Sequence, residues 1–294
     1  MTSSDHRPRS RLSRLALLAA VAVAAAGLAT LPTPVAAGDI LSYYADSKTT
    51  SGDGTYYWTT DWGQCSLVPR PPNARGRQGV ALNARQWREL GESAFCGMCV
   101  TVDGSGSGRG ADPIRGTYDA YVMDHCSSCT GGSWGGYGDL DFSDGGKDGR
   151  WDITWRAVPC PVEGPIEYVF VGSHKWYIKV QPRNLPVPIK EVYVNGWWAE
   201  RSRDGFFIFN AGGGLDMPFK IETVDVRGER FEDWFYDIRN GVAIQGSKWP
   251  TPGSAVLWGS GRTGVGGSGG VDAATSLAAN NTGVEAGTAK AAAA

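Results

Sequence analysis

Carboxylates and cysteines gather in one short stretch of the chain, residues 118–143. An alternating apolar pattern leads to Asp124, a Cys-x-x-Cys pair follows at Cys126 and Cys129, and a glycine-rich loop then leads to a second acidic cluster that contains Asp141. Two carboxylates that a loop brings together can serve as the acid and base of an active site. They can equally form the polar floor of a groove, and Asp124 alone can be a buried carboxylate held by loop amides.

The cysteines predict disulfides rather than a metal site. An even number of cysteines in an exported chain indicates a disulfide framework, with fifteen possible pairings for six residues. The competing hypothesis is a zinc site built from two Cys-x-x-Cys pairs, but the 26 residues between those pairs exceed the usual zinc-ribbon spacing, and two cysteines would be left over. We expect no metal and no cofactor. The six residues are Cys65, Cys96, Cys99, Cys126, Cys129 and Cys160.

The first 37 residues have the pattern of a signal peptide. Four arginines precede an Ala/Leu-rich run that ends in the small-residue sequence Val35-Ala36-Ala37. An uncleaved membrane anchor is the alternative, but the run is short for a membrane span. Removal of residues 1–37 leaves 24 basic and 29 acidic side chains, a net charge of −5. We therefore expect a secreted, soluble monomer that binds neither nucleic acid nor an anionic membrane.

The elements that must position these residues are short strands. Alternating segments at 41–45, 95–102, 117–123 and 152–158 predict a closed barrel or a sandwich over residues 38–161, with one short helix at 84–90 that Asn83 caps. After a Pro/Gly-rich linker, further strands at 167–171, 176–181, 190–194, 206–210 and 219–225 predict a small sandwich over residues 162–258. The Gly/Ser/Ala-rich tail, 259–294, is predicted to be disordered.

Several motifs, in order and spacing, resemble those of expansins, including microbial expansin-like proteins. They are CGMCVTV at 96–102, VMDHC at 122–126 with LDFS at 140–143, KDG at 147–149 with WRAVPC at 155–160, and, in the second half, WY at 176–177 and VDVRG at 224–228. The resemblance implies an all-β chain, a six-stranded double-psi β-barrel followed by an immunoglobulin-like β-sandwich that binds cellulose. It also implies loosening of plant-type cell walls without hydrolysis, and the pairing Cys65–Cys96, Cys99–Cys160 and Cys126–Cys129.

The same resemblance suggests roles for residues of a polysaccharide groove in the barrel. Asp141 falls where related cellulases keep their general acid, with Asp124 on the same side of the groove, and Ser42-Tyr43 match the Thr-Tyr pair that lines it. The cellulase base would lie in the first strand, where this chain has Ala45. Because Asp46 is one residue later, a regular strand would point it to the opposite face. We therefore expect Asp141 and Asp124 to be groove carboxylates with a non-hydrolytic role, because Asp141 lacks a catalytic base on the opposite side of the groove.

Three aromatic residues, Trp176, Tyr177 and Phe206, match the cellulose platform of the family's second domain, where flat sugar faces stack on rings. Ideal alternation conflicts with this match at Trp176, because it places Trp176 on the same face as core residues and Tyr177 on the other. In the barrel domain, Trp134 and Tyr137 either contact a glycan at the rim of the groove or fold back onto the barrel.

Two other classes of function remain open. The first is an endo-acting glycoside hydrolase related to family-45 cellulases, or a peptidoglycan transglycosylase. The second is a non-catalytic lectin or adhesin of the wall. The acidic net charge favours binding of cellulose through aromatic rings over charge-driven binding of acidic wall polymers.

Overall fold

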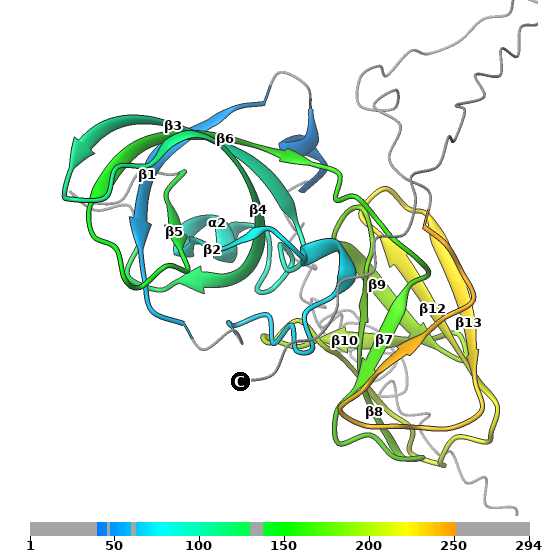
Figure 1. Cartoon of the computed structure of the whole chain (residues 1–294). Coiled ribbons are helices and arrows are strands. Elements are labelled where there is room, and N and C mark those ends of the chain that lie inside the picture. Colours follow the sequence, from blue (N-terminus) through cyan, green and yellow to red (C-terminus); the bar gives the residue numbers. More distant parts are fainter. Residues whose placement is uncertain (1–39, 46–47, 60–62, 130–137, 251–294) are drawn as a thin grey trace, which may run out of the picture. The chain divides into compact units, whose positions relative to one another are not determined.

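The computed structural model describes residues 40–45, 48–59, 63–129 and 138–250. Figure 1 shows these residues as a coloured ribbon. The predictions for the signal peptide at 1–37, for Asp46, for Trp134 and Tyr137, and for the tail at 259–294 lie outside the described residues.

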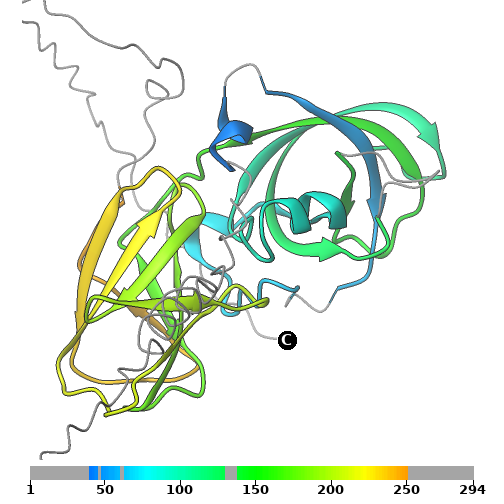
Figure 2. The ribbon, with the colours of Figure 1, turned by 180° about the vertical axis from the view of Figure 1, so that it is seen from behind.

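Six strands of the first half form a closed barrel, which confirms the expected fold. Its order is β1-β5-β2-β4-β3-β6, and the pairs β1·β5 and β2·β4 are parallel while the others are antiparallel. In the views of Figures 1 and 2, which look along the barrel, α2 overlaps the opening of the ring of strands. The strands are β1 (Thr50–Tyr56), β2 (Gln78–Asn83), β3 (Cys99–Arg109), β4 (Arg115–Cys126), β5 (Leu140–Phe142) and β6 (Arg150–Val158).

The first barrel strand is a segment that the sequence did not predict. Thr50–Tyr56 contains two glycines, which usually weaken a strand. Here they permit close approach: a Cβ on Gly52 would lie 2.2 Å from the backbone of Gly138, and one on Gly54 would lie 2.4 Å from the Ile114 side chain. The glycines therefore allow packing inside the barrel wall rather than a turn.

Residues 41–45, predicted as a strand, belong instead to the 3₁₀ helix η1 (Ile40–Tyr44). The physical reason is the spacing of its buried residues, Ile40, Tyr43 and Tyr44, which is helical and not alternating. The predicted short helix is confirmed as α2 (Ala84–Glu89), and the Asn83 side chain accepts a 2.8 Å hydrogen bond from the amide of Arg85. A second 3₁₀ turn, η2 (Pro72–Ala74), precedes β2.

The second half forms an antiparallel sheet in the order β13-β12-β9-β10-β11-β8-β7-β14. Its core is free of cysteine and rich in phenylalanine, with Phe170, Phe219 and Phe235 in mutual ring contact. The strands are β7 (Glu167–Phe170), β8 (Tyr177–Arg183), β9 (Ile189–Val194), β10 (Trp197–Arg201), β11 (Phe207–Asn210), β12 (Phe219–Asp225), β13 (Arg230–Phe235) and β14 (Ala243–Gln245).

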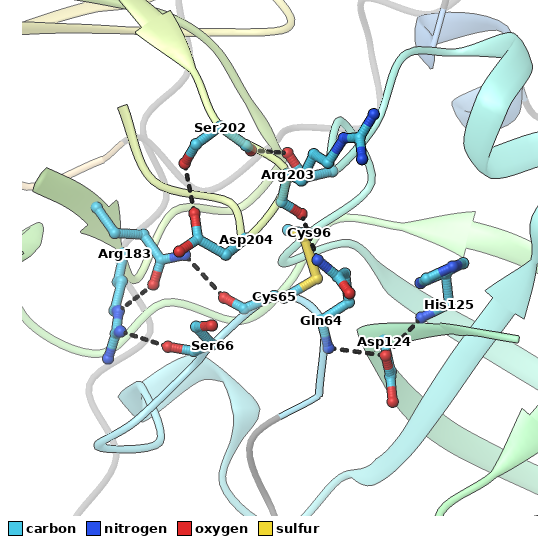
Figure 3. The surroundings of a disulfide bond; sticks show 12 residues. Gln64, Cys65, Ser66, Cys96, Asp124, His125, Arg183, Ser202, Arg203 and Asp204 are labelled. Atoms are coloured by element: carbon cyan, nitrogen blue, oxygen red, sulfur yellow. Dashed lines mark hydrogen bonds between the residues drawn. A yellow bond between two sulfur atoms is a disulfide. The ribbon is translucent and has the colours of Figure 1, made fainter. Parts of the chain in front are cut away.

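Polar contacts connect this sheet to the barrel segment around Cys65, and both belong to one compact unit. The buried Gln181 side chain donates to the carbonyl of Cys65, and the guanidinium of Arg183 donates to the carbonyls of Ser66 and Pro69 (Figure 3). Burial lowers the pKa of Arg183 to about 10.

The three disulfides are those that the family resemblance implied. Cys65 pairs with Cys96, Cys99 with Cys160, and Cys126 with Cys129. Among the described residues, no helix has the length and apolar character that a membrane span requires.

Candidate functional site

Strand register brings the two predicted carboxylates to the same level of the barrel wall. In β2, Ala81 pairs with Asp124 of β4 on one side and with Asp141 of β5 on the other, and Asp141 in turn pairs with Thr55 of β1. Directly paired residues share a face of the sheet, and two strand spacings place the Cα atoms of Asp124 and Asp141 roughly 10 Å apart. The small alanine between them keeps the row free of a large side chain.

Asp141 is half-buried and held by Thr55. The Thr55 hydroxyl donates a 2.6 Å hydrogen bond to Oδ1 of Asp141. Burial raises the pKa of Asp141 above its usual range, and the negative charge of Asp124 raises it further, while the Thr55 hydrogen bond and the positive charge of Arg150 oppose the rise. The carboxyl of Asp141 is therefore more readily protonated than an exposed aspartate, and in that form it can donate as well as accept hydrogen bonds.

Backbone amides hold Asp124. Its Oδ1 accepts hydrogen bonds from the amides of Gln64, at 2.7 Å, and His125, at 2.8 Å (Figure 3). This is the arrangement of a carboxylate satisfied by loop amides at a strand end. It fixes the direction of the side chain.

The Cys126–Cys129 disulfide lies against Asp141. The two sulfur atoms and a carboxylate oxygen of Asp141 lie within 4.8 Å of one another. Because the sulfurs are bonded to each other, they do not offer the thiolate charge that a metal ligand needs. The disulfide therefore packs beside the carboxylate of Asp141.

Two residues of this site were not predicted, Thr55 and Tyr57. Burial raises the pKa of Tyr57, and the negative charges of Asp124 and Asp141 raise it further. The sequence did contain one indication: Thr55 and Tyr57 are two residues apart, the spacing that puts both on one face of a strand. Next to them, Trp58 is exposed, and its ring lies over Gly145.

The structure corrects the predicted groove pair Ser42-Tyr43. Tyr43 is buried in the barrel core, where its ring stacks on Trp155 at 5.9 Å and its hydroxyl accepts a hydrogen bond from Gln86. Ser42 is exposed on η1. The pair belongs to a helical turn and not to the first strand, and the hydroxyl that contacts Asp141 is that of Thr55.

On the second sheet, Trp176 lies in a tight turn just before β8. His174 and Tyr177 exchange backbone hydrogen bonds around Lys175 and Trp176. Strand alternation therefore does not apply to Trp176, which is 52% exposed, with Lys175 Nζ 4.0 Å from the centre of its ring. Tyr177 begins β8 on the partly exposed face.

Phe206, the third predicted platform residue, is only 3% exposed, which contradicts its predicted role. Lys179 Nζ, which is paired with Asp204, lies 5.0 Å from the centre of the Phe206 ring. Trp176 is thus exposed and Tyr177 partly exposed, whereas Phe206 is buried; the role of Trp176 and Tyr177 in binding stays a prediction.

Comparisons with known proteins agree with the motifs. No family model matches the chain. Expansin-YoaJ of Bacillus subtilis (strain 168) is 31% identical over 93 residues, 30% of this chain, and the match spans only 39% of the length of that relative.

Two solved structures of an expansin from Clavibacter michiganensis, the apo protein and a mutant in complex with cellohexaose, each match with a TM-score of 0.55 and 21% identity. Each match covers 69% of this chain and 100% of the other. The similarity to expansins expected from the motifs is thus confirmed, in part of the sequence and in the fold of the barrel and the second sheet.

Proposed function

We propose that this protein is a secreted expansin. Its barrel domain, residues 38–161, would loosen noncovalent contacts between polysaccharides of plant-type cell walls, and its second domain, residues 162–258, would hold it on cellulose. The fold it shares with an expansin that was solved with cellohexaose supports this assignment.

The row Thr55–Asp141–Ala81–Asp124 is the observation that carries the proposal. It offers a half-buried carboxyl with a raised pKa, a hydroxyl that holds it in place, and a second carboxylate fixed by amides. Such groups can exchange hydrogen bonds with sugar hydroxyls and so compete with the contacts between neighbouring chains. Both carboxylates come from the same face of nearby strands, whereas glycoside cleavage needs them on opposite sides of the bond.

Trp176 and Tyr177 supply the anchor to cellulose. An exposed indole and a neighbouring phenol combine a large apolar area with few rotatable bonds, which suits stacking on flat sugar faces. The negative net charge of the mature chain leaves stacking as the main attraction, because acidic wall polymers would be repelled.

The test measures loosening and cutting in one experiment. Strips of heat-inactivated plant wall under constant load are incubated with the protein, extension is recorded, and reducing ends in the liquid are counted. The proposal predicts extension with no reducing ends above the buffer control. If the wall extends only when new reducing ends also appear, the protein acts by hydrolysis and the proposal is wrong.

An endo-acting glycosidase is the second candidate, because a raised pKa is what a general acid requires and Asp141 has one. Reducing ends from cellulose, or anhydro-muropeptides from peptidoglycan in the case of a transglycosylase, would establish it. Binding without extension and without products would indicate a lectin or adhesin.

A further inference from the structure

Two exposed aromatic residues lie at the end of β13, an edge strand of the second sheet. Alternation in β13 buries Phe231, Asp233 and Phe235 and exposes the residues between them. Trp234 is 57% exposed and Tyr236, directly after the strand, is 76% exposed. Tyr236 lies beyond the last residue of β13, so strand alternation does not place it, but its ring and that of Trp234 line the same cleft. An edge strand that displays large apolar rings risks aggregation unless the rings have a use.

The rings line an open cleft between β13 and the segment of β14. Beside them, Asp237, Arg239 and Gln245 also line this cleft. The three side chains end in planar groups that can each make two hydrogen bonds in fixed directions. Aromatic rings next to such groups match the two surfaces of a sugar, its apolar face and its hydroxyl rim.

A buried carboxylate makes the base of the cleft rigid. Asp233 is almost fully buried and accepts hydrogen bonds from the hydroxyl of Tyr168 and from the amide and hydroxyl of Ser247. Gly246 lies so close that a Cβ there would be 2.5 Å from Oδ2 of Asp233. These contacts fix the end of β14 against β13, so the cleft is formed before any ligand arrives.

We propose that this cleft is a second glycan-binding site and that it takes a neutral polysaccharide chain. The charged lining residues are two carboxylates, Asp233 and Asp237, and one guanidinium, Arg239. Because Asp233 is buried and hydrogen-bonded, the exposed charges of Asp237 and Arg239 balance, and the cleft has no excess of positive charge to attract an acidic ligand. Because the cleft is open to solvent, it suits a polymer rather than a small enclosed molecule. The site uses β13 and β14, whereas Trp176 and Tyr177 lie at the start of β8. The inference stands apart from wall loosening, because it needs only the second sheet.

The experiment uses the full chain with Trp176→Ala and Tyr177→Ala already in place, so that the first platform does not contribute. Binding of cellohexaose and hydroxyethyl cellulose is measured by titration calorimetry before and after Trp234→Ala plus Tyr236→Ala. We expect the remaining affinity to fall on the order of tenfold. Because both rings are exposed, thermal unfolding should be unchanged.

Trp198→Ala is the matched control, because Trp198 is 59% exposed and does not line the cleft. We expect it to leave the affinity unchanged. Equal affinity with and without Trp234 and Tyr236 would overturn the proposal, as would an equal loss with Trp198→Ala. A change in sedimentation mass in place of a change in glycan affinity would identify the rings as a contact between protein copies and would also overturn it. Because this experiment does not measure wall extension, failure of the second glycan-binding site can be distinguished from failure of the proposed wall-loosening function.

Discussion

Replacement of Trp176 by alanine should weaken binding to crystalline cellulose between tenfold and a hundredfold. Trp176 is 52% exposed, and an aromatic side chain buries about 150–250 Å² when fully covered. Stacking a sugar surface on the exposed half therefore removes about 100 Å² from water. At about 25 cal/mol per Å², this contributes about 2.5 kcal/mol. A factor of ten in Kd corresponds to about 1.4 kcal/mol, which gives the stated range.

The assay is depletion of protein from solution by microcrystalline cellulose at several protein concentrations, which separates affinity from the number of sites. Trp198→Ala again serves as control, because it removes an indole of similar exposure from a different part of the sheet. If the two variants lose affinity equally, nonspecific adsorption through exposed indoles explains binding to cellulose, and the reasoning from the Trp176–Tyr177 platform is refuted.

Three further predictions concern the barrel. Thr55→Val removes the hydroxyl that donates to Asp141, an interaction worth about 1.5–3 kcal/mol when the acceptor is charged. The substitution should therefore raise the pKa of Asp141 further, which NMR titration of its carboxyl group measures. An unchanged pKa would show that the hydrogen bond from Thr55 contributes nothing. Burial raises the pKa of Asp141 in the folded state, so its ionised form costs stability at pH values above that pKa and costs nothing below about pH 3.9. Asp141→Asn should accordingly have a higher free energy of unfolding than the wild type at pH 7, and this difference should disappear at pH 3. Urea unfolding of both proteins at both pH values measures the difference. The same difference at pH 7 and pH 3 would contradict the prediction. Gly52→Ala should lower the free energy of unfolding by about 1–3 kcal/mol, because its Cβ would meet the Gly138 backbone, while Gly146→Ala, which has open space around it, should change stability by less than about 0.5 kcal/mol.

Local patterns in the sequence predicted the elements whose causes are local. Asn83 before a short apolar-periodic segment predicted α2. Alternation predicted three of the six barrel strands, β3, β4 and β6, and five of the eight strands of the second sheet, β7, β8, β9, β11 and β12. Asp124 and Asp141 were identified as site residues because each lies in a motif, VMDHC at 122–126 and LDFS at 140–143, that matches the expansin pattern over several consecutive residues. The disulfide pairing needed the family resemblance, because six cysteines alone leave it open.

The remaining features depend on contacts between distant residues. Gly52 and Gly54 resemble turn residues until the backbone that they approach is known, so β1 was missed and Thr55 with it. Thr55 and Asp141 are 86 residues apart, and only strand register brings them together. Phe206 matched a family position by type, but its burial under Lys179 is a tertiary fact.

The measurement that tests the central claim most directly is wall extension by Asp141→Asn, compared with the wild type at equal amounts of protein bound to the wall. The carboxyl of Asp141 is proposed to carry the loosening, and the second domain to carry the binding. The account predicts that this variant binds crystalline cellulose as the wild type does and produces no extension. Full extension by the variant would contradict the account.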